Sequence, residues 1–398
     1  MRDAGAAAGR RLPPLVRALG AVSFFNDLAS EMVYPLLPAF VTRTLGAGAF
    51  VLGALDGVAD AVAAVVKLAA GWLSDRPAWR KPLVVGGYAV AAVTRPVIGI
   101  ASAAWHVVAL RAADRVGKGA RNPPRDALIA DAVAFESRGR AFGFHRSMDH
   151  AGAMIGPLVA SGLIAGFAMA PAEVIRWSLV PGLAAALVVA WTLRRPPITD
   201  EPRAASAGSP PREERRAPRA AFVLILFFAA LRTPETLMLL RLQEVGVSLA
   251  LIPALWAALH LVRSAASYPG GWLTDRAGAA RTMVLGWAIY AAVCGGLATS
   301  RGPAAAIAWF LLFGLVAATT EAPERTLVAA LGGRRARGRG FGLYHAGVGA
   351  AALPGSLALG ALYQLRGGPV ALGTSAAAAV VLSGAGLWIT RGATARAT

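Results

Sequence analysis

Cysteine and charge are both scarce in this sequence. Cys294 is the one cysteine among 398 residues, so no disulfide can form within the chain. Charged residues make up 15% of the chain, although soluble domains carry about a quarter, and hydrophobic residues make up 56%. Apolar runs of about 20 residues recur along the whole length, and each could cross a bilayer core of about 30 Å. The composition therefore excludes an ordinary soluble domain and predicts a polytopic protein in a lipid bilayer.

The sequence also lacks the signatures of several other classes. It has no Walker A pattern, so we expect no ATP hydrolysis within the chain. It has no enzyme motif and no cluster of methionine and histidine suited to a dedicated metal site, so we expect no catalytic residue, metal or cofactor. Residues 1–9 show no signal-peptide pattern, and the first apolar run is too long for one, which predicts a retained first helix.

Acidic residues are few compared with basic ones. The chain has 40 Lys and Arg against 21 Asp and Glu, a formal net charge of +19. The cations lie mainly in short segments between apolar runs, whereas a nucleic-acid binder would gather them on one soluble face, so we expect no nucleic-acid partner. Because Lys and Arg concentrate in alternate connections, the positive-inside rule places both termini in the cytoplasm. The Arg-, Ala- and Gly-rich usage is typical of a GC-rich bacterium and predicts a multi-pass protein of its inner (plasma) membrane.

Hydropathy divides the chain into two sets of six spans. Residues 1–193 form a predicted N-terminal six-helix bundle and residues 220–398 a C-terminal one. Residues 194–219 are rich in Pro, Arg, Ser and Glu without apolar periodicity, which predicts a disordered cytoplasmic linker. The twelve predicted spans are 17–41, 50–74, 83–101, 104–131, 138–166, 173–193, 220–243, 247–273, 281–299, 303–331, 338–364 and 370–390.

The two halves repeat one another in sequence. Gly-Trp-Leu-Ser-Asp-Arg at 71–76 returns as Gly-Trp-Leu-Thr-Asp-Arg at 271–276, an offset of 200 residues. Arg-Gly-Arg-Ala-Phe-Gly at 138–143 returns as Arg-Gly-Arg-Gly-Phe-Gly at 337–342, an offset of 199. An even number of helices per half makes the repeat parallel. Such halves pack around an axis along the membrane normal, with a site between them near the midplane.

These features resemble the major facilitator superfamily over nearly the whole chain. The resemblance implies an all-α membrane protein with twelve transmembrane helices in two parallel-related six-helix bundles. Its Gly-x-x-x-Asp-Arg motif stands at both repeats, but the first copy continues with Pro77 and Ala78 where glycine and a basic residue are usual. The span 138–166 also carries Gly152, Gly156 and Pro157, which look like the family's antiporter motif and imply export. The alternative for these residues is close helix packing.

The repeated motif predicts a mechanical latch. Asp75 and Asp275 could each dock on a neighbouring helix N-terminus, where unpaired N–H groups favour an anion. Arg76 and Arg276 would then bridge to the other half. We assign Gly71 and Gly271 to the same latch, and we count Gly152, Gly156 and Pro157 among the gate residues as well. The alternative is that these basic residues serve only membrane topology.

A stripe of cations runs along the span 104–131. Its members recur every three or four residues and so share one helical face, about 21 Å long. Each such charge costs roughly 2.5–3.5 kcal/mol at a bilayer centre, so the stripe must face water, acids or a solute. We predict solute binding by Arg115, Lys118 and Arg125, and the alternative is pairing with Asp114, Asp126 and Asp131. The stripe consists of Arg111, Arg115, Lys118, Arg121 and Arg125.

Acids and a tyrosine share one face of the first span. Asp27 and Glu31 are candidates for proton coupling, because an acid within a membrane is a functional hypothesis by default. Tyr34 on the same face is a candidate for solute binding. The alternative is a static bridge from Asp27 or Glu31 to an arginine.

Other polar residues lie within the remaining spans. Asp60 and His260 occupy matching positions of the repeat and are predicted to form a proton relay or a gate, with local salt bridging as the alternative. Arg232 and Glu235 flank a helix-breaking proline and, with Glu321, are predicted to line the cavity. Four further residues are assigned to the inner gate, namely His145, Arg146, Asp149 and His345.

The sequence therefore predicts a proton-coupled secondary transporter that works by alternating access. Export of a small organic solute in exchange for protons is the leading hypothesis, and the cations favour an anion or a zwitterion. Three alternatives stay open: an uptake symporter or uniporter of an organic anion or metal chelate, a cationic multidrug/proton antiporter, and a sensor or scaffold that transports nothing. We expect a monomer whose partners are the solute, protons and the lipid bilayer.

Overall fold

The computed structural model describes residues 12–37, 40–46, 49–194, 218–248, 251–331 and 337–394, and within these ranges it contains helices and turns but no strand. Each predicted span coincides with one helix or with consecutive helical pieces. Most of the predicted linker, residues 195–217, lies outside the described ranges. The first half contains α2 (Pro14–Val33), η1 (Tyr34–Leu36), η2 (Phe40–Thr44), α4 (Ala49–Leu73), α5 (Pro77–Ile98), α6 (Ala104–Asp131), η3 (Phe135–Ser137), α7 (Arg138–Phe167), α8 (Pro171–Trp177) and α9 (Leu179–Arg194).

The second half is likewise built from helices. A proline at its first or second position starts α15, as in α2, α5 and α8, because the missing N–H costs nothing in the first turn. The helices are α11 (Pro218–Leu231), α12 (Glu235–Glu244), α13 (Ile252–Ala277), α14 (Ala279–Thr299), α15 (Pro303–Leu312), α16 (Gly314–Leu331), α17 (Arg337–Arg366) and α18 (Gly368–Thr394).

By length and hydropathy alone, six helical segments of the described chain could cross a membrane. The helix α6 is not among them, because the cation stripe lowers its hydropathy. The six segments are 135–167, 171–194, 279–299, 303–330, 337–366 and 368–388.

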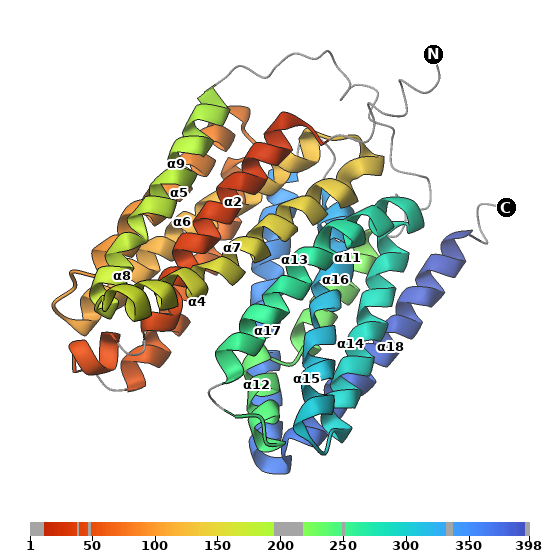
Figure 1. The fold of residues 1–398 in the computed structure, drawn as a ribbon. Coiled ribbons are helices and arrows are strands. Elements are labelled where there is room, and N and C mark those ends of the chain that lie inside the picture. The colour runs from red at the N-terminus through yellow and green to blue at the C-terminus, as the bar shows by residue number, and fades with distance from the viewer. Residues whose placement is uncertain are drawn as a thin grey trace.

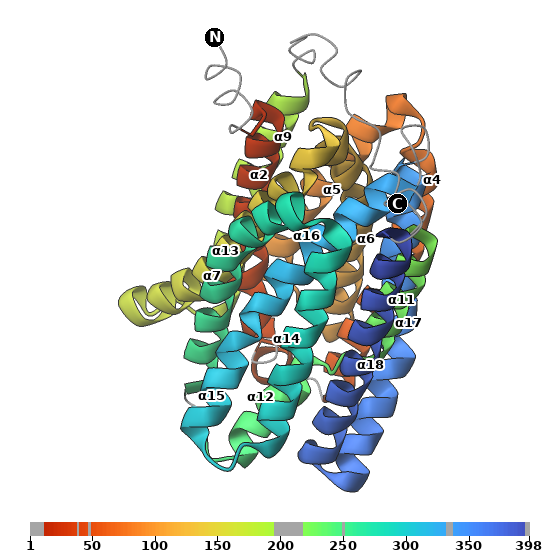
Figure 2. The ribbon, with the colours of Figure 1, turned by 90° about the vertical axis from the view of Figure 1, so that its right-hand side faces the viewer.

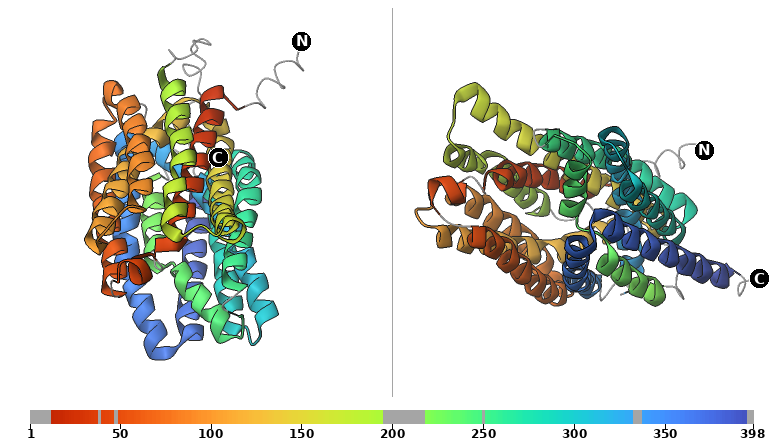
Figure 3. Two further views of the ribbon diagram at one scale, coloured as in Figure 1. Left: turned by 60° about the vertical axis from the view of Figure 1, so that its left-hand side comes forward. Right: turned by 90° about the horizontal axis from the view of Figure 1, so that it is seen from below.

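The helices gather into two adjoining groups, α2 to α9 and α11 to α18 (Figure 1). The view from below separates the same two groups (Figure 3), and the long helices run roughly along one axis (Figure 2). The helix α16 packs against α7 and α6 packs against α17, but the groups join chiefly at two crossings, of α7 with α13 and of α4 with α17. We call the end of the bundle that carries Asp75 and Asp275 the basic end.

Glycines bring the backbones together at both of these helix crossings. A Cβ atom on Gly271 of α13 would lie 2.2 Å from the carbonyl oxygen of Gly139 in α7. A Cβ atom on Gly71 of α4 would lie 2.6 Å from the Cα of Gly342 in α17. Each repeated motif thus supplies a glycine that faces glycines of the other repeated motif. Only a residue without a side chain allows this approach.

Asp275 joins the second group of helices to the first. Its carboxylate accepts hydrogen bonds from the backbone N–H groups of Gly139 (2.7 Å) and Arg140 (3.0 Å), at the N-terminus of α7. It also accepts one from Nε of Arg140 at 3.0 Å. The first-turn N–H groups of a helix have no partner within the helix, so an anion there is stabilised by direct bonds and by the helix dipole.

Asp75 makes the related contact in the opposite sense. Its carboxylate lies at the N-terminus of α17, where it accepts a bond from the backbone N–H of Arg339 (3.0 Å) and one from Nε of the same residue (3.3 Å). Each half therefore places an aspartate on a helix of the other half. We call these contacts the Asp275 latch and the Asp75 latch.

The bridging arginines differ from those expected. Arg140 and Arg339 pair with the latch aspartates, whereas Arg76 is exposed at the start of α5 and Arg276 lies over the ring of Trp272 at 5.1 Å. Arg76 and Arg276 directly follow the latch aspartates in sequence. Because neighbouring residues of one turn point in different directions, their side chains point away from the helix that the carboxylate contacts. A further bridge joins the halves through Asp131, which pairs with Arg80 at 2.5 Å and with Arg337.

Replacing Gly271 with alanine should destabilise the protein. The new methyl group would meet the Gly139 carbonyl oxygen, and overpacking of this kind costs about 1–3 kcal/mol. The matched control is Gly295→Ala, since a Cβ there meets nothing within 4 Å and alanine favours helix. Thermal unfolding in detergent should show a lower midpoint for Gly271→Ala alone. Equal midpoints would mean that the glycine contact contributes nothing.

Removing the charge of Asp275 should open the basic end. Hydrogen bonds to a charged group contribute about 1.5–3 kcal/mol each, so Asp275→Asn should shift the closed state toward the open one by about tenfold or more. The reporter is Ser264→Cys in a Cys294→Ser background, because Ser264 faces Ser147 between α13 and α7. Maleimide labelling in detergent should accelerate accordingly, whereas the exposed control Glu173→Gln should leave its rate unchanged. An unchanged rate in Asp275→Asn would contradict a gating role.

Candidate functional site

Small residues fix the orientation of α6. A Cβ on Gly117 would lie 2.7 Å from the carbonyl oxygen of Gly87 in α5, and one on Gly119 would lie 2.8 Å from the side chain of Val66 in α4. The glycine face of α6 therefore packs against α5 and α4. Arg111, Arg115 and Lys118 lie on another face of α6, which turns toward α2.

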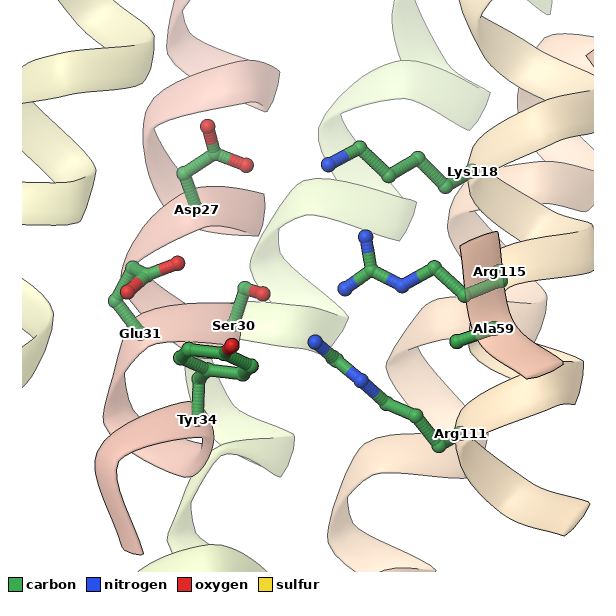
Figure 4. A pocket seen from close by; sticks show the side chains of 8 residues that line it. All are labelled: Asp27, Ser30, Glu31, Tyr34, Ala59, Arg111, Arg115 and Lys118. Carbon is green, nitrogen blue, oxygen red and sulfur yellow. The ribbon is translucent and has the colours of Figure 1, made fainter. Parts of the chain in front are cut away.

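A cavity of about 360 Å³ lies between α2 and α6. Asp27 and Glu31 of α2 form one side, which we call the acid wall (Figure 4). Three residues of α6 form the other side, which we call the cation wall; they are Arg111, Arg115 and Lys118. Ser30, Tyr34 and Ala59 complete the lining. The structure thus brings together two sets of charges that the sequence placed on different helices.

The two walls face each other without direct bonds. Among the residues that the structure describes, no ion pair or hydrogen bond joins the acid wall to the cation wall. Figure 4 shows the ammonium of Lys118 directed toward Asp27 and the guanidinium of Arg115 directed toward the acid wall. The guanidinium carbon of Arg111 lies 5.0 Å from the centre of the Tyr34 ring. A charged solute could therefore enter between the walls without breaking an ion pair.

One buried carboxylate balances the cation wall from behind. Asp114 is fully buried and pairs with Arg95 at 2.9 Å, with Arg115 at 3.4 Å and with Arg111 at 3.5 Å. A single negative charge thus serves three guanidinium groups. The cation wall keeps an excess of positive charge toward the cavity.

Asn26 links this network to the acid wall. Its side-chain oxygen accepts hydrogen bonds from Arg95 (3.1 Å) and Arg121 (3.2 Å). Its amide nitrogen donates to Asp27 at 2.8 Å. Because two guanidinium groups hold the oxygen, the amide nitrogen must face Asp27, and this bond orients the carboxylate.

The part of the stripe nearer the basic end, Arg121 and Arg125, contacts other residues and does not line the cavity. Arg121 donates to the Gly87 carbonyl at 3.0 Å and stacks over Tyr88 at 4.6 Å. Arg125 is buried and pairs with Asp126 at 2.9 Å, so the structure places it in an ion pair and not in the cavity lining. Asp126 also contacts the second half of the chain.

Two ion-pair clusters join the halves between the cavity and the basic end. Asp126 lies 2.9 Å from Nε2 of His345 and 3.5 Å from Nε of Arg325. In the second cluster, Arg146 of α7 pairs with Glu321 of α16 and, at 2.5 Å, with Asp149. The structure therefore places Glu321 in a contact between the halves and not in the lining of the described cavity.

Asp149 and two histidines extend the second cluster. Ser23 of α2 donates a hydrogen bond to Asp149, whose other oxygen lies 3.7 Å from Nδ1 of His145. His150 lies 3.7 Å from Glu321, and its ring centre is 5.5 Å from that of His260 in α13. The ring of His260 also packs on Trp256. The pairing of His260 with Asp60 stays a prediction, because the structure does not describe the side chain of Asp60.

Arg232 and Glu235 form a cluster of their own. The helical conformation is interrupted between α11 and α12, where Pro234 precedes the first residue of α12. Glu235 pairs with Arg263 at 2.7 Å and with Arg232 at 3.2 Å, and both guanidinium groups lie over the ring of Phe313. These residues lie apart from the cavity between α2 and α6.

Gly152 and Gly156 serve the packing of α7 on α2. A Cβ on Gly152 would lie 2.2 Å from the carbonyl oxygen of Phe24, and one on Gly156 would lie 2.7 Å from that of Leu28. Pro157 follows within the same helix. Both contacts lie within the first half and hold the helix that carries the acid wall.

Sequence reasoning missed Arg95 and Asn26. Arg95 stands alone in an apolar run before Pro96, which is an unusual place for a cation and could have signalled a buried partner. Asn26 precedes Asp27 without any pattern of its own. Their roles depend on the packing of α5 beside α2 and α6, which helical periodicity does not determine.

The sequence matches the family model of the Major Facilitator Superfamily over residues 19–263. An uncharacterized protein of Mycobacterium tuberculosis is 31% identical over 361 residues, which cover 88% of this chain and 87% of that protein. An uncharacterized MFS-type transporter of Methanocaldococcus jannaschii is 27% identical over 363 residues, covering 89% of this chain and 90% of that protein.

A solved structure gives the same fold. The crystal structure of the human organic anion transporter MFSD10 aligns with a TM-score of 0.74 and 15% identity, covering 93% of this chain and 99% of that one. The family model and the mycobacterial relative together show the family. The chain belongs to the major facilitator superfamily, a family of twelve-helix transporters, and is a multi-pass membrane protein.

Proposed function

We propose that this chain is a secondary active transporter that moves a small organic anion or zwitterion, coupled to protons, by alternating access. The cavity between the acid wall and the cation wall carries this proposal. A carboxylate of the solute would bind Arg115 and Lys118, and an amine, where present, would bind Asp27 or Glu31. The volume of about 360 Å³ suits a small molecule.

The arrangement of contacts supports a state closed at the basic end. Among the described residues, the polar contacts between the halves lie between the cavity and the basic end, from Ser147–Ser264 and the two ion-pair clusters to the latches. A solute would therefore reach the cavity from the opposite end. Breaking these contacts and closing that end would expose the cavity to the other side.

The distribution of cations supports the sidedness of the proposal. Arg80, Arg140 and Arg339 all lie at the basic end, as the positive-inside rule expects for a cytoplasmic surface. We place that end on the cytoplasmic side of a bacterial inner membrane, which makes the described state outward-facing. Gly152 and Gly156 are accounted for by helix packing, so they give no argument for export over uptake.

The rival functions fit the cavity less well. A transporter of simple lipophilic cations would have to accept three positive charges in its binding site. A sensor or scaffold has no need for a polar cavity within the membrane, where each charge is costly. The solute binding site therefore favours transport of an anion or zwitterion.

Arg115→Ala and Lys118→Ala should each abolish transport while the protein still folds. The loss of one charged hydrogen-bonding partner costs about 1.5–3 kcal/mol, or about 10- to 100-fold in solute affinity. A thermal-shift screen of organic anions and zwitterions would identify a ligand, and counterflow in proteoliposomes would measure its transport. The matched control is Arg176→Ala, whose guanidinium pairs with Glu173 at an exposed site in α8. Normal counterflow in both cavity variants would exclude the cation wall as the binding site.

A further inference from the structure

Among the described residues, the acid wall supplies the only negative charges that line the cavity opposite the cation wall. Asp114 is fully buried and does not line the cavity, so a solute in the cavity would leave its pairs with Arg95, Arg111 and Arg115 in place. Asp27 and Glu31 face the cavity, and no ion pair holds them to the opposite wall. They stabilise the cations only through space.

Lys118 is the cation that depends most on the acid wall. Arg121 and Arg125 each have a polar partner in Asn26, Gly87 or Asp126. Lys118, by contrast, has no carboxylate within ion-pairing distance among the described residues. Its ammonium faces Asp27 across the cavity (Figure 4). An anion that binds Lys118 would stand between these two charges.

The other charged groups around the acid wall already have partners of their own. Asp149 already receives hydrogen bonds from Arg146 and Ser23. The helix α9, which packs against α2, has one titratable group, Arg194, at its last residue. The helix α8 carries the exposed pair Glu173–Arg176. The charged and titratable groups that face the acid wall are Tyr34 of η1, Arg95 of α5, Arg111, Arg115 and Lys118 of α6, and Arg146 and Asp149 of α7.

We infer that an anionic solute and a proton bind this site together. An anion on Lys118 and Arg115 neutralises the cations that favour the charged form of the acid wall, and it brings a negative charge beside two carboxylates one helical turn apart. One proton from water then binds a carboxylate oxygen of Asp27 or Glu31. The two acids act as a pair, so the proton belongs to both.

This inference rests on the proposed function and adds the sign of its coupling. Because linkage is reciprocal, a proton that promotes anion binding is itself bound more tightly when the anion is present. An anion therefore crosses the membrane with a proton. A solute that places a cationic group on the acid wall competes with the proton and is exchanged for it.

Calorimetry on the purified protein in detergent tests this directly. Wild-type protein is titrated near neutral pH with succinate, and separately with sulfate, in two buffers of different ionisation enthalpy. The difference in heat gives the number of protons bound, and we expect about one proton for each anion. The double variant Asp27→Asn, Glu31→Gln should bind the anion without proton uptake and about tenfold more tightly. The control Glu173→Gln should keep the wild-type proton count.

Each outcome has a separate meaning. If neither anion binds the wild-type protein, the anion site of the proposed function is wrong. If an anion binds without proton uptake, or if the double variant still takes up a proton, the proposed function stands and the coupling inference is wrong. Should the double variant fail to fold, as judged by size exclusion, the wild-type affinity decides: it must weaken as pH rises, and a constant affinity would overturn the inference.

Discussion

The cost of placing charge within a membrane determines how this protein is built. Five cations on α6 would not be tolerated against lipid, so the neighbouring helices of the first half must shield these side chains from it. Glycines turn the opposite face of α6 toward α4 and α5, and the cations point inward. Asp126 pairs with Arg125, and Asn26 and the Gly87 carbonyl accept hydrogen bonds from Arg121. The remaining cations face a cavity, where the unbalanced charge is available to a solute.

The same constraint separates structural from functional charges. Arg121 and Arg125 lie at the deeper end of the stripe, where buried partners surround them and join them to neighbouring helices. Arg115 and Lys118 lie where α2 stands back from α6. The distinction depends on the distance between helices and not on residue type. Arginine thus holds helices together at one level of α6 and lines the cavity at another.

Much of the fold could be predicted from the sequence because its signals are local. Apolar runs gave the spans, and the repeat at 71–76 and 271–276 located the latch aspartates. Helical periodicity placed the cations of α6 on one face and the acids of α2 on another. The pairing of distant residues could not be predicted in this way. Arg140 and Arg339 as latch partners, and Glu321 as the partner of Arg146, follow from which helices cross, and that is a property of the assembled bundle.

The glycine crossings have a mechanical consequence. Where side chains interlock as ridges and grooves, helices cannot move past one another without changing rotamers. At Gly71 with Gly342, and at Gly271 with Gly139, backbone rests on backbone and no ridge obstructs the surface. In the proposed alternating access, one half would therefore turn against the other at these two points while its internal packing stays unchanged. The hydrogen bonds of the aspartate beside each crossing would then stop this motion in one of the two states.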